Sequence, residues 1–132
     1  AVLALETGEL AYANAGHNPP LLFCQESGAV QRLEKGETAL GVLPEQRFTS
    51  RARQLHAGDF LVLYTDGITE AFSPLDHMYG EEGLKQTIQA ALENSQVVTA
   101  GELLGVIDEA VQVFVGDAPP AADLTLLVLR RE

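Results

Sequence analysis

The sequence predicts an α+β fold, in which mostly antiparallel strands form two packed sheets and helices cover the outside. Three observations lead to this class. Two hairpin patterns occupy the first part of the chain, a buried-strand pattern lies in the middle, and two apolar stripes at helical spacing follow. At 132 residues, the chain is long enough to bury one core but not two. A single domain of about seven strands and two long helices is therefore expected.

Both hairpin patterns lie in the first 33 residues. Residues 2–5 and 10–13 flank a short turn that contains glycine, and residues 21–24 and 30–33 flank a second one. Between the hairpins, residues 14–20 contain a glycine and two consecutive prolines, which fit neither a helix nor the interior of a strand. A rigid loop is expected there.

Residues 60–64 form the clearest strand. The run is apolar, contains β-branched and aromatic side chains, and is bounded by Gly-Asp and Asp-Gly pairs, which is typical of a strand covered on both faces. A half-exposed strand is predicted before it, over residues 48–55. Asp66 stands at the exit of the central strand, where its carboxylate would be held on a rigid element, and Gly67 would let backbone or a ligand approach closely. The alternative is that Asp66 and Gly67 form only a turn, because Asp-Gly is a common turn pair.

Two helices are predicted after residue 80. The first covers residues 81–93, and the second begins at Thr99, where Thr99 and Glu102 have the spacing of a capping box. Gly116 ends the second helix. The apolar stripes predict core positions rather than a cofactor site. They consist of Leu84, Ile88, Ala91 and Leu92 in the first helix and of Leu103, Ile107, Ala110, Val111 and Phe114 in the second.

A last strand is predicted over residues 124–129, and an acidic residue, Asp123, precedes it. If this strand is the antiparallel neighbour of residues 60–64, the exit of one and the entry of the other lie at one sheet edge, and Asp66 and Asp123 converge. Two carboxylates without a fixed cationic partner repel each other, and a divalent cation is the usual resolution. Oxygen ligands suit Mg²⁺ or Mn²⁺, whereas the lack of a Cys/His cluster argues against structural zinc.

Composition excludes several classes of protein. The apolar share of 46% and the charged share of 20% are ordinary for a globular domain. The net charge of −11 disfavours nucleic acid as a partner but is compatible with divalent cations. No apolar run approaches the roughly 20 residues of a membrane span, and the start of the chain lacks the basic region of a signal peptide. Because the lone Cys24 cannot form an internal disulfide, the cytoplasm is the expected compartment.

Three segments, in this order, resemble the signature of the bacterial stage II sporulation protein E and sigma-B-regulator phosphatases, which belong to the metal-dependent protein phosphatases of type 2C. They are residues 12–22 with the sequence YANAGHNPPLL, residues 58–71 with GDFLVLYTDGITEA, and residues 123–130 with DLTLLVLR. The resemblance extends over essentially the whole chain. It implies the αββα sandwich of the type 2C phosphatases.

The resemblance also implies an activity. Phosphatases of this class hydrolyse phosphoserine or phosphothreonine with a water activated by two Mn²⁺ or Mg²⁺ ions. Asp66 matches a metal-ligating aspartate, so Asp66 and Asp123 are the expected catalytic residues, and these two with Gly67 are the expected metal site. The implied substrate is a small regulator of the anti-anti-sigma type, and the implied controller is an upstream sensor or response-regulator domain. The family's earlier glycine- and aspartate-rich metal motif has no counterpart in residues 1–132, which are therefore expected to be the C-terminal part of a single larger domain.

His17, Asn14 and Thr65 are the expected rim of the pocket. In the wider phosphatase class, the loop that corresponds to residues 14–20 carries an aspartate near the metal, and histidine titrates nearest to neutral pH. The alternative is a structural His17, whose ring bonds to nearby backbone. A further hypothesis concerns assembly: sheet edges left open by the missing part would favour a homodimer or strand exchange.

One position departs from the family pattern. The usual terminal motif is Asp-Asp-x-Thr, and this chain has Ala122 in the first place. The second hypothesis is therefore a non-catalytic pseudophosphatase that keeps the fold as a scaffold. An unrelated β-rich hydrolase has less support, because the chain contains no Gly-x-Ser-x-Gly elbow, His-Glu-x-x-His helix or Walker loop.

Overall fold

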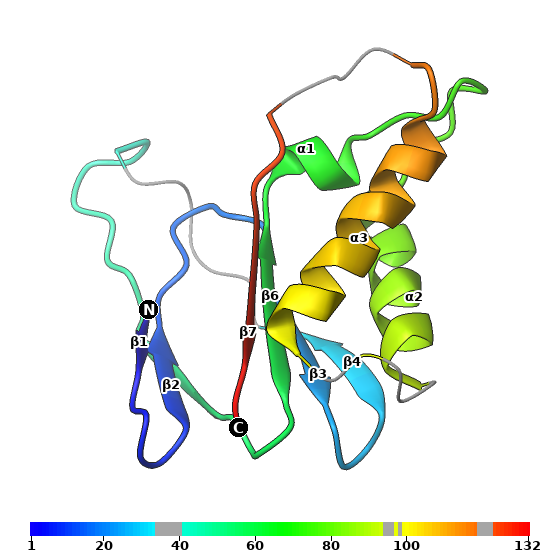
Figure 1. Ribbon diagram of the computed structural model, residues 1–132. Coiled ribbons are helices and arrows are strands. Elements are labelled where there is room, and N and C mark those ends of the chain that lie inside the picture. The colour runs from blue at the N-terminus through cyan, green and yellow to red at the C-terminus, as the bar shows by residue number, and fades with distance from the viewer. Residues whose placement is uncertain (34–40, 94–96, 98, 119–122) are drawn as a thin grey trace.

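The computed structural model has three layers, namely a three-stranded sheet, a four-stranded sheet and a pair of long helices (Figure 1). All strand pairs in the described part of the chain are antiparallel. The helices cover the face of the four-stranded sheet that points away from the other sheet. This arrangement confirms the predicted α+β class with two packed sheets. The structure describes residues 1–33, 41–93, 97, 99–118 and 123–132.

The three-stranded sheet has the order β1-β2-β5. The predicted first hairpin forms β1 and β2, and β5 pairs along the other side of β2. The prediction of a strand over residues 48–55 was too long. Because β2 ends at Tyr12, which pairs with Arg51, residues 48–50 have no partner in β2. The strands are β1 (Val2–Leu3), β2 (Glu9–Tyr12) and β5 (Arg51–Gln54).

The four-stranded sheet has the order β4-β3-β6-β7, so that the strand predicted as central has neighbours on both sides. Its antiparallel pairing with the last strand is confirmed, with Tyr64 opposite Leu126. The last strand starts two residues later than predicted, because the regular strand pairing ends at Tyr64 opposite Leu126 and the chain then turns into a helix at Asp66. The strands are β3 (Leu21–Cys24), β4 (Ala29–Arg32), β6 (Phe60–Tyr64) and β7 (Leu126–Arg130).

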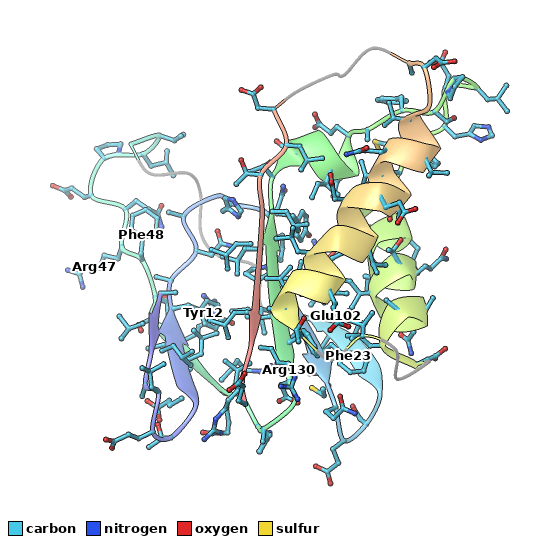
Figure 2. The ribbon with its side chains drawn as sticks, in the orientation of Figure 1. Tyr12, Phe23, Arg47, Phe48, Glu102 and Arg130 are labelled. Atoms are coloured by element: carbon cyan, nitrogen blue, oxygen red, sulfur yellow. The ribbon has the colours of Figure 1, made fainter. Side chains whose placement is uncertain are left out.

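Strand β6 separates two hydrophobic cores, one on each of its faces, so the expectation of a single core was wrong, whereas the burial of this strand on both faces is as predicted. Phe60, Val62 and Tyr64 pack under the helices, whereas Leu61 packs with Tyr12 against the three-stranded sheet. Figure 2 shows Tyr12 in the space between the sheets. Burial raises the pKa of Tyr64 to about 12. The two cores hold β6 rigidly from both sides.

The two long helices are α2 (Gly80–Glu93) and α3 (Ala100–Val115). Each turns a stripe of apolar side chains into the core beneath it. The Thr99 hydroxyl oxygen accepts a hydrogen bond of 3.1 Å from the backbone N–H of Glu102, which confirms that half of the predicted capping box. No helix in the described part of the chain is long and apolar enough to span a membrane. The fully buried stripe residues are Leu84, Ile88, Leu103 and Ile107.

A short helix, α1 (Asp66–Thr69), follows β6 directly, and the sequence pattern does not predict it. Its single turn is closed by a hydrogen bond of 2.7 Å from the backbone N–H of Glu70 to the carbonyl of Asp66. Ile68, which is completely buried, anchors it on the core. One turn is too short to produce a helical periodicity in the sequence. The helix is therefore recognised only in the tertiary structure, where Ile68 packs into the core.

The carboxylate of Asp59 is the main polar group inside the fold. It lies at the start of β6 and is only 2% exposed. Its Oδ1 accepts from the backbone N–H of Gln25 at 2.9 Å, and its Oδ2 accepts from the backbone N–H of His56 at 2.8 Å. One buried side chain thereby joins the end of β3 to the turn that leads into β6.

Asp59→Asn is expected to lower the free energy of unfolding by about 2 kcal/mol. An amide offers one acceptor oxygen, so its NH₂ group would face either the Gln25 or the His56 N–H, and one buried donor would lose its bond. Urea unfolding followed by circular dichroism measures the change. Asp117→Asn, at an exposed position after α3, is the matched control, and equal stability of the two variants would contradict this role of Asp59.

Candidate active site

Asp66 stands where the rigid β6 strand ends and α1 begins, and its side chain is exposed. The side-chain amide of Asn18 donates a hydrogen bond of 2.8 Å to Asp66 Oδ1. Within the described residues, no hydrogen-bond donor reaches Oδ2. One carboxylate oxygen is therefore held by the protein, and the other is available to a ligand.

The loop that carries Asn18 is fixed by hydrogen bonds of its own. Asn14 is 6% exposed, and its Oδ1 accepts from the backbone N–H of His17 at 2.7 Å. Its Nδ2 donates to the carbonyl of His17 at 3.1 Å. Gly16 has a φ of +83°, a left-handed conformation that favours glycine, which lets the chain turn between these two residues. The rigid loop predicted for residues 14–20 is thus built around the side chain of Asn14.

The ends of β6 and β7 are joined by Thr65. Its hydroxyl oxygen accepts from the backbone N–H of Thr125 at 2.9 Å, and the hydroxyl lies 3.3 Å from the carbonyl oxygen of Asp123. Its backbone N–H donates to the carbonyl of Thr125 at 3.1 Å. Asp123 is thereby placed at the same sheet edge as Asp66, as the antiparallel pairing predicts for the backbone.

Gly67 is the point of closest approach between the two strand ends. A Cβ atom on Gly67 would lie 2.2 Å from the carbonyl oxygen of Asp123 and 2.9 Å from Cα of Leu124. No side chain fits into this space without a shift of backbone. Glycine is required here because of the contact, which is the close backbone approach that the sequence predicts.

A small hollow of about 140 Å³ opens beside Asp66. His17 and Thr65, both predicted at the rim, line it. The His17 ring nitrogen Nδ1 lies 2.9 Å from the carbonyl oxygen of Asn18, so the ring also supports the loop. Asn14, the third residue predicted at the rim, is buried and does not line this hollow. The lining residues are Gly16, His17, Asn18, Thr65 and Asp66.

The groups available as metal ligands at this edge are oxygen atoms, which suit a hard divalent cation. Magnesium is usually bound by one or two carboxylates and keeps several waters, so one exposed Asp66 carboxylate beside a backbone approach fits part of such a site. Among the described residues, no group of three or more His, Cys, Asp or Glu side chains is placed to hold a metal ion. Ala122, the position that departs from the family pattern, lies outside the described residues.

Asn18 is the site residue that sequence reasoning did not identify. Its partner Asp66 lies 48 positions away, so no local spacing connects the two side chains. The only signal is that Asn18 belongs to the same Pro-containing loop as His17. From the sequence alone, an asparagine at this position is expected only to stabilise a turn. Its contact with Asp66 becomes visible only when the loop is placed against α1.

Comparisons with known proteins identify the family of this chain. The family model described as Stage II sporulation protein E (SpoIIE) matches residues 1–132. The chain is 34% identical over 114 residues to Protein IcfG from Synechocystis sp., covering 84% of this chain and 18% of that protein. It is 27% identical over 130 residues to the phosphoserine phosphatase RsbU of Bacillus subtilis, covering 97% of this chain and 36% of that protein. The chain thus spans about a third or less of these relatives.

Solved structures share the fold. The PP2C phosphatase domain of SpoIIE from Bacillus subtilis, solved with a fragment of its regulatory domain, aligns with a TM-score of 0.78 at 20% identity. The alignment covers 97% of this chain and 36% of that one. The Mn-presoaked form of that phosphatase domain aligns with a TM-score of 0.69 at 18% identity over 98% of this chain and 53% of that one. Because the family model matches all 132 residues and the fold agrees, the chain belongs to the Stage II sporulation protein E (SpoIIE) family.

Proposed function

We propose that the chain is the C-terminal part of a metal-dependent serine/threonine phosphatase domain of type 2C, and that this domain hydrolyses phosphoserine or phosphothreonine on a regulatory protein. The observation that carries the proposal is the exposed Asp66 carboxylate at the exit of β6. It is held by Asn18 and lies at the edge where β7 enters the sheet. Family membership, and a relative named as a phosphoserine phosphatase, support the reaction class.

The residues that would hold Mn²⁺ or Mg²⁺ are Asp66, Gly67 and Asp123. When bound, such an ion lowers the pKa of a coordinated water and neutralises charge on the transferred phosphoryl group. Asp66 supplies a carboxylate whose orientation is already fixed. Gly67 lets the Asp123 backbone approach, and Thr65 ties the two strand ends together through its hydroxyl. In this proposal, the chain contributes one carboxylate, that of Asp66, which a hydrogen bond from Asn18 already orients.

The proposed substrate is a small phosphorylated regulator of the anti-anti-sigma type, and an upstream sensor or response-regulator domain is the proposed controller. Both proposals follow from the resemblance to the sigma-B-regulator phosphatases. The hollow beside Asp66, at about 140 Å³, is smaller than the roughly 300–1,000 Å³ pockets that enclose small-molecule ligands and cofactors. Substrate selection would then depend on the surface around the hollow.

A pseudophosphatase that uses the fold as a scaffold is the second candidate function. Ala122 in place of the first aspartate of the terminal motif favours it. A measurement of metal-dependent hydrolysis separates the two candidates.

The test is hydrolysis of an aryl phosphate and of a phosphoserine peptide, with Mn²⁺ and after chelation. It is carried out on residues 1–132 and on the longest natural chain that contains them. We expect Mn²⁺-dependent activity in the longer chain and its loss on chelation, because the bound ion activates the attacking water. No hydrolysis by either chain, together with no saturable Mn²⁺ binding by calorimetry, would instead identify the scaffold.

A further inference from the structure

We propose that Asn18 is a positioning residue that orients the Asp66 carboxylate for a divalent cation. The inference rests on the proposed metal-dependent function. The side chains are 48 residues apart in sequence and are joined by a hydrogen bond of 2.8 Å from Asn18 Nδ2 to Asp66 Oδ1. The bond connects the loop between the hairpins to the first residue of α1.

The direction of this hydrogen bond follows from its chemistry. An ionised carboxylate only accepts hydrogen bonds, so the NH₂ group of Asn18, and not its carbonyl oxygen, must face Asp66. The bond restricts rotation of the carboxylate and engages Oδ1, which leaves Oδ2 for a ligand. A carboxylate held in this way loses less conformational freedom when it binds a cation.

The lack of charge on Asn18 is the second part of the inference. Lysine or arginine at this position would also hold the carboxylate, but its positive charge would repel a divalent cation. An amide donates a hydrogen bond without that repulsion. No Lys or Arg lines the hollow that contains Asn18 and Asp66 in the described part of the chain. Asn18 therefore orients the ligand and leaves its negative charge available.

Asn18 is itself held in place by the fold. The backbone carbonyl oxygen of Asn18 lies 2.9 Å from Nδ1 of His17. The side chain of the buried Asn14 forms hydrogen bonds with both the backbone N–H and the backbone carbonyl of His17. Pro19, which follows Asn18, is buried and restricts the backbone on that side. The amide thus reaches Asp66 from a loop that is ordered before any ligand binds.

The experiment measures Mn²⁺ binding by calorimetry in the longest natural chain that contains these residues, for the wild type and three variants. Asn18→Leu keeps the branched shape and removes the donor, and Asp66→Asn removes the proposed ligand. Gln112→Ala is the matched control, because the Gln112 amide also donates to an exposed carboxylate, that of Asp108, at 3.1 Å on α3. We expect Asn18→Leu to raise the Kd for Mn²⁺ by about tenfold or more, as loss of a residue that orients a metal ligand usually does. Gln112→Ala should leave it unchanged.

Two further readouts exclude a merely structural role. Without metal, the Asn18→Leu and Gln112→Ala variants should both stay folded with only a small change in Tm, since each loses one exposed amide–carboxylate bond and alanine offsets part of that loss in the helix. In NMR spectra of the wild type, substoichiometric Mn²⁺ should broaden the side-chain NH₂ signal of Asn18 before that of Gln112. A signal of Asn18 that stays sharp while Mn²⁺ binds would overturn the inference.

The outcomes also separate the inference from the function on which it rests. If Asp66→Asn abolishes Mn²⁺ binding and Asn18→Leu binds like the wild type, the metal site stands and the positioning role is wrong. If the wild type binds no Mn²⁺, or Asp66→Asn binds as tightly as the wild type, the proposed site and the role of Asn18 are both wrong. Selective weakening by Asn18→Leu supports both.

Discussion

Asp66→Asn is expected to lower kcat/KM for Mn²⁺-dependent phosphate hydrolysis by at least about a hundredfold, because loss of residues that only orient a metal ligand already costs 10–100-fold. The substitution removes the negative charge that would bind the cation. It keeps the shape of the side chain, and the amide oxygen still accepts the hydrogen bond that Asn18 donates to Oδ1 in the wild type. The fold should therefore survive while the activity is lost.

The measurement is the rate of aryl phosphate hydrolysis against Mn²⁺ concentration, with circular dichroism as the check on folding. Asp76→Asn serves as the control, because Asp76 is an exposed carboxylate in the loop after α1. Its rate should match that of the wild type. If Asp66→Asn kept more than a tenth of the wild-type rate, the cation would be held by other groups, and Asp66 would have only the turn role that its Asp-Gly sequence permits.

Gly67→Ala is expected to lower the free energy of unfolding by at least about 3 kcal/mol, at the upper end of the cost of overpacking. The added methyl group would lie 2.2 Å from the carbonyl oxygen and 2.7 Å from the carbonyl carbon of Asp123. Both are backbone atoms, so the entry of β7 must move away from the exit of β6. That movement would also stretch the hydrogen bonds that Thr65 makes with Thr125.

Gly105→Ala is the matched control for this prediction. Gly105 lies in α3, and a Cβ there would meet nothing within 4 Å. Alanine is a better helix former than glycine by about 1 kcal/mol, so the control should become more stable. Urea unfolding of both variants measures the difference. A Gly67→Ala variant as stable as the wild type would show that the two strand ends do not meet as described.

The two substitutions change different properties of this sheet edge. Asp66→Asn changes charge and leaves the packing intact, whereas Gly67→Ala changes packing and leaves the Asp66 carboxylate in place. If Gly67→Ala also reduces Mn²⁺-dependent activity, the backbone approach of Asp123 is part of the site. If it reduces stability alone, the approach serves only to close the sheet edge.

Much of the architecture follows from local patterns. The apolar run at residues 60–64 predicts burial on both faces, and Phe60, Leu61 and Val62 are indeed buried in two different cores. The spacing of Thr99 and Glu102 predicts the start of α3, where the hydroxyl binds the Glu102 N–H. These features are predictable because periodicity, capping and turn chemistry depend on residues close together in sequence.

The features that were wrong or missing depend on partners elsewhere in the chain. The strand predicted over residues 48–55 is limited to β5, because its length is set by where β2 ends. Helix α1 is a single turn and depends on the burial of Ile68. The orientation of the Asp66 carboxylate depends on the hydrogen bond that its Oδ1 accepts from Asn18, which lies in a different loop.

By itself, the sequence determined the α+β class, the two long helices, the strand that Asp66 follows, the strand that Asp123 precedes, and the family signature in residues 58–71. Only the tertiary structure decided that Asn18 donates to Asp66 and that Gly67 touches the Asp123 backbone. The physical reason is the range of the interactions. Periodicity and capping act within a few residues, whereas contacts at a sheet edge depend on the register between strands and on the course of the loops that connect them.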